Sequence, residues 1–201
     1  MKKKTKKTNY DVIIVGGGPA GLFGAYYLAE NSNLDVLVID KGKASLKRKC
    51  PIKDKGCIKC RPCNILCGIG GAGLFSDGKL NFIHKLGKTD LTQFMAESEA
   101  RDLIDETEQI FNRFGMDGQI YPTDLDQAYQ IRKDARKCGI DLLVIKQKHL
   151  GSDNLPNHIA GMADYIKEKG VRFKHSEEVR DILVEGEKIC GVVTNKGEYH
   201  A

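Results

Sequence analysis

Two short apolar runs at the start of the chain flank a stretch with helical periodicity. Residues 10–15 and residues 35–39 are rich in β-branched side chains, and such uninterrupted runs are typical of buried parallel strands. The residues between them, 19–30, predict a helix, with Pro19 in the first turn, where a missing N–H costs nothing. The pattern therefore predicts a β-α-β unit.

The remaining periodicity predicts further helices and strands. The helices are expected over residues 90–114, 124–138 and 156–169. The strands are expected over residues 140–147, 171–174, 179–184 and 189–194. Residues 43–87 are different, because they are rich in Lys, Cys and Gly and show no sustained periodicity. A loop of this length inside a compact domain needs a functional reason.

These elements predict an α/β fold with a Rossmann-like, three-layer domain. We expect this domain to be discontinuous, built from residues 10–45 and 140–201, with residues 46–139 inserted as a Cys/Gly-rich loop and a helical segment. Residues 1–9 are expected to form a disordered basic tail. The chain stops just after a turn, so we expect the domain to be truncated at its C-terminus.

A dinucleotide-binding motif joins the first strand to the first helix. Gly16, Gly18 and Gly21 match G-x-G-x-x-G, in which the glycines allow a tight turn, a close approach to a diphosphate and close helix packing. Asp40 ends the second strand, where a carboxylate accepts hydrogen bonds from a ribose. The predicted cofactor-binding residues of this unit are Gly16, Gly18, Pro19, Ala20, Gly21, Asp40 and Lys41. The alternative is a glycine-rich turn in an unrelated α/β fold.

The surroundings of the motif favour FAD over NAD. The motif continues as Gly21-Leu22-Phe23-Gly24-Ala25, the second strand ends in Ile39-Asp40-Lys41-Gly42, and a helix and short strands follow over residues 159–197. Together these segments resemble the FAD-binding domain of the glutathione-reductase-like flavoproteins, many of which carry Glu in place of Asp40. The resemblance implies FAD. The alternative is an NAD-dependent dehydrogenase that uses Asp40 on the ribose.

A second glycine-rich loop covers residues 68–81. Closely spaced glycines bring backbone N–H groups near a flat or anionic ligand, so we expect contacts with the flavin ring or its diphosphate. The predicted contacts are Gly70, Gly71, Ala72, Gly73, Ser76, Asp77 and Lys79. The alternative is a flexible surface loop. With residues 149–156, this stretch resembles a family of bacterial and archaeal FAD-dependent dehydrogenases whose substrates are uncharacterised, which implies redox chemistry without naming a substrate.

Five of the seven cysteines fall within residues 50–67. Cys57, Cys60, Cys63 and Cys67 have the spacing of one bacterial ferredoxin run, and Cys50 precedes them. The candidate metal ligands are therefore Cys57, Cys60, Cys63, Cys67 and Cys50, for a 4Fe–4S cluster or for zinc. Reduced or redox-active thiols without a metal are the alternative, since Gly68 stands where the ferredoxin run has proline. Cys138 and Cys190 are expected to be small core residues.

Charge and composition indicate the class of protein and its expected location. Hydrophobic residues make up 41% and charged residues 29%, as in globular proteins, and no apolar run approaches the ~20 residues of a membrane span. The net charge of +5 comes from the lysines of residues 2–7, which have no interleaved aromatic residues, so we expect no nucleic-acid partner. The absence of a signal peptide in this sequence and the clustered cysteines predict a reducing, cytoplasmic location.

These observations predict an FAD-dependent oxidoreductase, a dehydrogenase that passes electrons between a small-molecule substrate and flavin. An iron–sulfur or other metal centre would serve as a relay, and NAD(P)H, ferredoxin or another redox partner protein would exchange electrons with it. Because the flavin carries the hydride chemistry, no catalytic acid or base is assigned. A non-enzymatic thiol or zinc redox sensor on a nucleotide-binding scaffold is a further alternative.

Overall fold

The computed structural model describes residues 8–52, 56–151 and 153–201. Most of the predicted basic tail, together with Lys53 and Lys55, therefore lies outside the described residues. The chain divides into two compact units, which we call the first unit (Met1–Phe75 and Ile159–Ala201) and the second unit (Ser76–His158). None of the helices that the described residues form is long and apolar enough for a membrane span.

A parallel sheet and its connecting helix form the centre of the first unit. Among the described residues its strand order is β1-β2-β8, with β1 at Val12–Val15, β2 at Val36–Asp40 and β8 at Arg172–His175. All three strands run parallel, and every residue of β2 is buried. Helix α1 (Pro19–Asn31) connects β1 to β2 and buries Leu22 and Ala25. The predicted β-α-β unit is confirmed.

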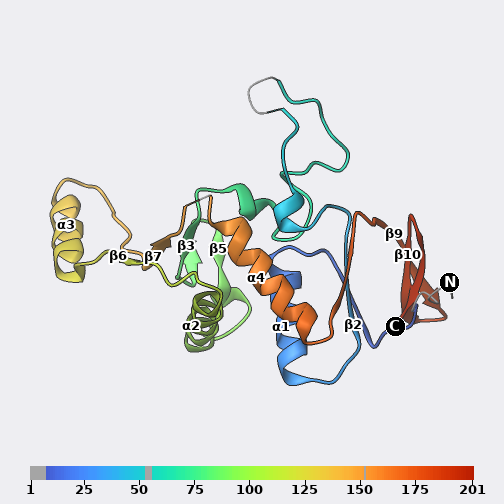
Figure 1. The fold of residues 1–201 in the computed structure, drawn as a ribbon. Coiled ribbons are helices and arrows are strands. Elements are labelled where there is room, and N and C mark those ends of the chain that lie inside the picture. Colours follow the sequence, from blue (N-terminus) through green and yellow to red (C-terminus); the bar gives the residue numbers. More distant parts are fainter. Residues whose placement is uncertain (1–7, 53–55, 152) are drawn as a thin grey trace. The chain divides into compact units, whose positions relative to one another are not determined.

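An antiparallel meander covers the other side of this sheet. It consists of β9 (Val179–Glu185), β10 (Lys188–Thr194) and β11 (Gly197–His200), in the order β11-β10-β9. Tyr10, Leu37, Ile39, Val192 and Tyr199 form a buried cluster that joins meander and sheet. Figure 1 shows β2 between this meander and the helices α1 and α4 (Leu155–Glu168), so helices, parallel sheet and meander make the predicted layers.

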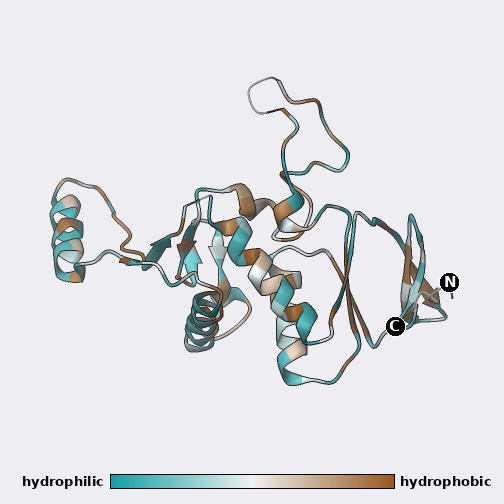
Figure 2. Cartoon of the chain, in the orientation of Figure 1, coloured by the Kyte–Doolittle hydropathy of each residue, from teal (hydrophilic) through white to brown (hydrophobic). Residues whose placement is uncertain are grey.

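The second unit contains short strands and two amphipathic helices. Strands β3 (Lys79–Asn81), β7 (Gln147–His149) and β6 (Ile120–Tyr121) pair antiparallel, and β4 (Lys85–Leu86) forms a hairpin with β5 (Thr89–Asp90). The helices are α2 (Glu97–Arg113) and α3 (Leu125–Lys137). Figure 2 shows the hydrophilic colouring of α2, in contrast to the apolar positions along β2.

Two predicted elements of the second unit are wrong in detail. The strand expected over residues 140–147 is absent from the described residues 140–146, and strand pairing starts only at Gln147. Ile140 and Leu143 are each 54% exposed, so this apolar run is not held against a core that would keep it extended. The helix expected from residue 90 begins at Glu97, because Asp90 caps the short 3-10 helix η3 (Leu91–Gln93) first.

Candidate nucleotide-binding site

The nucleotide loop, residues 16–21, links β1 to α1 through its backbone. Gly16 adopts a φ of 101°, and its N–H donates to the carbonyl of Ile39 at 2.7 Å. A Cβ at Gly21 would lie 1.9 Å from the Gly16 carbonyl oxygen, so only glycine lets the helix approach the loop this closely. A Cβ at Gly16 would meet nothing within 4 Å, so the loop backbone borders open space.

The N-terminus of α1 has the features of an anion site. Gly18 is the N-cap, and no described side chain caps the helix there. Pro19 follows in the first turn and has no N–H, while the N–H groups of Ala20 and Gly21 belong to the first turn, which has no intrahelical acceptors. The helix dipole adds partial positive charge at this end. Pro19 and Ala20 are exposed, so a diphosphate has access to the helix end.

The carboxylate of Asp40 fixes the loops on either side of it. Its Oδ2 accepts from the N–H of Gly17 at 2.8 Å, and its Oδ1 accepts from the N–H of Gly42 at 2.7 Å. Asp40 is only 8% exposed. A carboxylate oxygen has room for two hydrogen bonds, so each oxygen can also accept from a ribose hydroxyl. Asp40 therefore supports the loop and borders the site.

The second glycine-rich loop packs directly against the nucleotide loop. The N–H of Gly70 donates to the carbonyl of Gly17 at 2.8 Å, and a Cβ at Gly71 would lie 3.3 Å from the Cα of Gly18. Ile69 is buried between them, at 1% exposed. Gly70 is buried, and a Cβ there would press on Leu74 and Ile159, so it contributes to packing, and as a cofactor contact it stays a prediction. Gly71 borders the site itself.

The other predicted residues of this loop lie further on. Ala72 and Gly73 are exposed and begin the 3-10 helix η2 (Ala72–Phe75). Ser76, Asp77 and Lys79 belong to the second unit, where the Asp77 carboxylate and the Lys79 ammonium lie 2.8 Å apart. Hydrogen bonds from Lys79 hold the pKa of Asp77 below its ordinary value. As cofactor contacts, these five residues stay predictions.

Arg48 organises the second glycine-rich loop and was not predicted to do so. It follows the 3-10 helix η1 (Ser45–Lys47) and is 3% exposed. Its guanidinium donates at 2.6–3.3 Å to the carbonyl oxygens of Asn64, Ile65, Gly68 and Ile69. Burial lowers the pKa of Arg48, and the nearby Asp40, Cys67 and Cys63 act in the opposite direction. Nothing in the sequence separates Arg48 from the basic residues around it.

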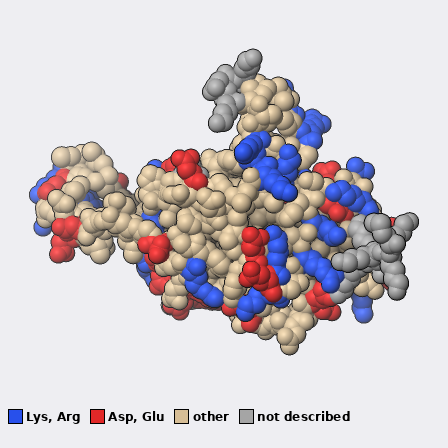
Figure 3. All heavy atoms as spheres, in the orientation of Figure 1, with Lys and Arg blue, Asp and Glu red and all other residues tan. Residues whose placement is uncertain are grey.

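Two adjoining cavities open beside the nucleotide loop. The nucleotide cavity, about 380 Å³, is lined by Val15, Gly16, Gly18, Ile39, Asp40, Lys41, Leu66, Cys67, Gly68, Gly71, Glu177, Glu178 and Val179. A cavity of about 820 Å³ shares Lys41, Cys67 and Glu178 with it. Its further lining residues are Lys43, Cys60, Arg61, Pro62, Cys63, Asn64, Ser176 and Asn195. Residues 50–65 form a loop of the first unit that we call the projecting loop, and Figure 3 shows Lys and Arg gathered at its base.

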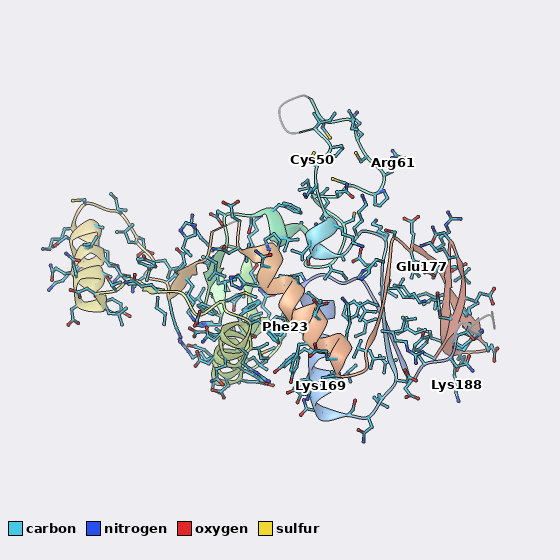
Figure 4. The ribbon with its side chains drawn as sticks, in the orientation of Figure 1. Phe23, Cys50, Arg61, Lys169, Glu177 and Lys188 are labelled. Carbon is cyan, nitrogen blue, oxygen red and sulfur yellow. The ribbon has the colours of Figure 1, made fainter. Side chains whose placement is uncertain are left out.

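Glu177 and Glu178 have different environments in these cavities. Glu177 is 3% exposed, and its Oε1 accepts from the hydroxyls of Thr194 at 2.8 Å and Tyr199 at 2.9 Å. These bonds tie the turn after β8 to the meander, and Figure 4 shows Glu177 in that region. Glu178 is exposed and lines both cavities. The sequence assigned neither residue a role.

The clustered cysteines line three neighbouring cavities. Cys50, Cys57, Cys60 and Cys63 line a cavity of about 130 Å³, Cys67 lines the nucleotide cavity, and Cys60, Cys63 and Cys67 line the cavity of about 820 Å³. All seven thiols are free, and among the described residues no three or more His, Cys, Asp or Glu side chains are placed to hold a metal ion. Cys138 is exposed because α3 buries none of its described residues, so its predicted core position is wrong. Cys190 is partly buried.

Comparisons with known proteins agree with this architecture. The Thi4 family matches residues 1–45, which include the β-α-β unit. The chain is 28% identical over 214 residues to the sarcosine oxidase subunit beta of Arthrobacter sp, covering 97% of this chain and 50% of that protein. The chain therefore spans about half the length of this curated relative.

Solved structures of the same fold include oxidases and a dehydrogenase. Glycine oxidase from Geobacillus kaustophilus matches with a TM-score of 0.53 at 19% identity, over 97% of this chain and 54% of that one. L-amino acid deaminase from Proteus vulgaris matches with a TM-score of 0.53 at 16% identity, over 98% and 47%. A 3-ketosteroid-Δ4-(5α)-dehydrogenase from Rhodococcus jostii RHA1 matches with a TM-score of 0.53 at 13% identity, over 98% and 44%. At these identities the likeness shows the fold.

Proposed function

We propose that this chain is the nucleotide-binding part of an FAD-dependent oxidoreductase that passes electrons between a small-molecule substrate and the flavin. The observation that carries the proposal is the nucleotide cavity, where the uncapped N-terminus of α1, the glycine backbone and the Asp40 carboxylate meet. This combination provides donors for a diphosphate and acceptors for a ribose in one place.

The residues present fit the adenosine diphosphate part of FAD. The N–H groups of Ala20 and Gly21 would hold the diphosphate, and Asp40 would hold the ribose. The adjoining cavity offers Ser176, Glu178 and Asn195 as hydrogen-bonding partners for a base. When bound, FAD supplies the two-electron acceptor for a hydride from the substrate. The residues described above bind and orient the nucleotide.

The sequence resemblances and the comparisons favour a flavin enzyme. The glycine loop 70–80 and the β8–β11 segment are similar to those of FAD-dependent dehydrogenases, and similar proteins are named as oxidases, a deaminase and a dehydrogenase. Since the names include both glycine and a ketosteroid, the fold does not select one substrate class. We propose NAD(P)H or ferredoxin as the electron partner, and a reducing, cytoplasmic setting in view of the cysteines.

Adding one methyl group at Gly18 tests whether the nucleotide cavity binds FAD. A Cβ at Gly18 would meet only the Cα of Gly71, at 3.9 Å, so Gly18→Ala should fold normally while narrowing the nucleotide cavity. We expect the purified protein to carry FAD, identified after release by denaturation, and the variant to bind FAD about tenfold more weakly. Gly24→Ala is the matched control, because its Cβ lies on α1 and would meet Ile14 at 3.9 Å. Equal FAD affinity of Gly18→Ala and the wild-type protein would contradict the proposed site.

The alternatives give different results in the same preparation. An NAD-dependent dehydrogenase would be colourless and would bind NAD with Asp40 on the ribose. A non-enzymatic thiol or zinc sensor would show no flavin reduction with any substrate or with NAD(P)H under anaerobic conditions. A yellow protein whose flavin is bleached by a reduced substrate or by NAD(P)H supports the oxidoreductase and excludes both alternatives.

A further inference from the structure

The projecting loop of the first unit, residues 50–65, brings four closely spaced thiols to one small cavity. The cavity of about 130 Å³, which we call the four-cysteine cavity, is lined by Cys50, Cys57, Cys60 and Cys63. Its other lining residues are mostly apolar: Pro51, Ile52, Ile58, Asn64 and Ile65. Figure 4 shows Cys50 and Arg61 on this loop, which extends away from the parallel sheet in Figure 1.

Cys67 does not line the four-cysteine cavity, although the sequence spacing groups it with the others. Its backbone N–H donates to the carbonyl of Cys63 at 2.9 Å, which closes a helical turn. Beyond this turn Cys67 lines the nucleotide cavity, next to the backbone of Gly42. Cys67 shares the cavity of about 820 Å³ with Cys60 and Cys63, but only the four-cysteine cavity is lined by Cys50 and Cys57 as well, so we take Cys50 as the fourth ligand.

The backbone between Cys57 and Cys60 is shaped around a sulfur atom. Lys59 adopts a φ of 54°, in the left-handed region that non-glycine residues rarely enter. In this turn its N–H points to the Sγ of Cys57, at 3.4 Å. Hydrogen bonds to cysteine sulfur tune iron–sulfur centres, and unfavourable backbone conformations concentrate at functional sites. The turn is thus suited to a thiolate that carries negative charge.

The sequence of the segment is basic. Residues 44–71 contain seven Lys or Arg residues and one acidic residue, Asp54. A basic segment offsets the net negative charge of a thiolate-ligated centre.

We propose that the cysteines of the four-cysteine cavity ligate a single iron–sulfur cluster. Thiolates on one zinc ion lie about 2.3 Å from the metal, which leaves no empty space among them. An iron–sulfur cluster instead places a core of iron and sulfide atoms between its thiolates. A cavity of about 130 Å³ leaves room for such a core, and Cys57, Cys60 and Cys63 have the spacing of a bacterial ferredoxin run, so we propose the cluster over zinc.

Cluster binding would draw the thiols inwards from the arrangement seen here. Cys50 and Cys57 are exposed, and the Cys50 thiol donates to the carbonyl of Ile52 at 3.1 Å. None of the described side chains in this group stands in a ready metal site. Because metal binding and local folding are coupled, the cluster supplies the contacts that order the loop around it. The inference does not depend on flavin binding.

The test is the metal content of the full protein purified without oxygen. We expect iron and acid-labile sulfide in the wild-type protein. We expect iron to fall about tenfold or more in each of the ligand variants. These variants are Cys50→Ser, Cys57→Ser, Cys60→Ser and Cys63→Ser. Cys67→Ser and Cys138→Ser are the matched controls and should keep their iron, since neither residue lines the four-cysteine cavity.

Each contrary result has a distinct meaning. Loss of iron in Cys67→Ser with retention in Cys50→Ser would overturn the ligand set, and zinc in place of iron and sulfide would overturn the cluster. Protein without either metal after anaerobic purification and reconstitution with iron and sulfide would also overturn it. Flavin is measured separately, so protein with iron and no flavin refutes the proposed function, whereas flavin without iron refutes only the cluster.

Discussion

The nucleotide loop and the four-cysteine cavity carry the two most distinctive motifs of the chain, and the structure organises them in opposite ways. The nucleotide loop is fixed by backbone contacts with buried surroundings, including the Gly70 N–H bond to Gly17 and the Asp40 carboxylate bond to the Gly17 N–H. Its shape is set by contacts within the chain. A ligand at such a site binds to backbone groups whose positions are fixed by the fold.

The four-cysteine cavity depends on side chains that can still rotate. Cys50 and Cys57 are exposed, and the loop that carries them contributes few buried residues. The cysteine motif determines which sulfur atoms are available as ligands. A bound metal centre would determine the positions of these sulfur atoms. The comparison teaches that backbone motifs are assembled by folding itself, whereas thiol motifs are completed by their ligand.

The largest effect is expected from a methyl group placed between α1 and the nucleotide loop. In Gly21→Ala the new Cβ would lie 1.9 Å from the Gly16 carbonyl oxygen, so the backbone must move. We expect a loss of about 3 kcal/mol in the free energy of unfolding, measured by urea denaturation, and no bound flavin. Gly24→Ala, one turn later, should instead stabilise the protein by about 0.5–1 kcal/mol. Similar stabilities for the two variants would show that the loop is not preformed.

The next effect tests whether Arg48 maintains the second glycine-rich loop. In Arg48→Met the carbonyl oxygens of Ile65 and Ile69 lose donors at 2.6 and 2.8 Å. We expect a loss of about 2 kcal/mol in stability. FAD affinity should also fall, although Arg48 does not line the nucleotide cavity, because Gly71 loses its support. Lys49→Met is the control, since Lys49 is exposed. If Arg48→Met had the same stability and FAD affinity as this control, Arg48 would not maintain the second glycine-rich loop.

A smaller effect is expected at Asp40, where one acceptor becomes a donor. Both carboxylate oxygens accept backbone N–H groups, so the amide of Asp40→Asn must direct its NH2 at one of these donors. We expect a loss of about 1–2 kcal/mol in stability and a rise of about tenfold in the Kd for FAD. Asp181→Asn makes the same charge change at an exposed position of β9 and should leave the Kd unchanged. If the Kd for FAD rose equally in Asp40→Asn and Asp181→Asn, the effect would come from charge alone, which would contradict the hydrogen bonds assigned to Asp40.

Local patterns predicted most of the first unit. The run Val36–Ile39 is buried on all sides, so its apolar sequence directly reports its environment, and the G-x-G-x-x-G spacing describes backbone geometry within one turn. The strand predicted over residues 140–147 was wrong because Ile140 and Leu143 have no apolar surface to pack against. The sequence places a residue correctly where its role depends on its nearest neighbours.

The parts that the sequence missed depend on distant contacts. Arg48 meets carbonyl groups at residues 64–69, and no local pattern contains that pairing. Cys67 follows the other cysteines at ligand spacing, yet it lines the nucleotide cavity and not the four-cysteine cavity. Motif spacing therefore identified the candidate atoms at both sites, while tertiary contacts decided which of them share a cavity.

The smallest effect concerns the hairpin β4–β5, where the exposed Lys85 pairs with the partly buried Asp90. Hydrogen bonds from Lys85 and then Thr92 lower the pKa of Asp90 from its ordinary value of 3.8 to about 2. Because this pKa is lower in the folded chain, the ionised Asp90 stabilises the hairpin above pH 3.8, and this contribution is lost as the pH falls through about 2. We expect the carboxyl carbon of Asp90 to titrate near 2 by NMR.

Replacing the partner of Asp90 provides the control for that measurement. In Lys85→Met the Lys85 ammonium, 2.7 Å from the Asp90 carboxylate, is removed, so the pKa of Asp90 should rise towards 3.8. Salt should have the same direction of effect in the wild-type protein, because exposed ion pairs are screened. FAD binding should not respond to either change if the nucleotide loop is held by its own buried bonds. If the affinity for flavin changed as Asp90 titrates, surface charges would help to organise the nucleotide loop. The nucleotide loop would then not be fixed by its own buried contacts, and it would no longer differ in this respect from the four-cysteine cavity.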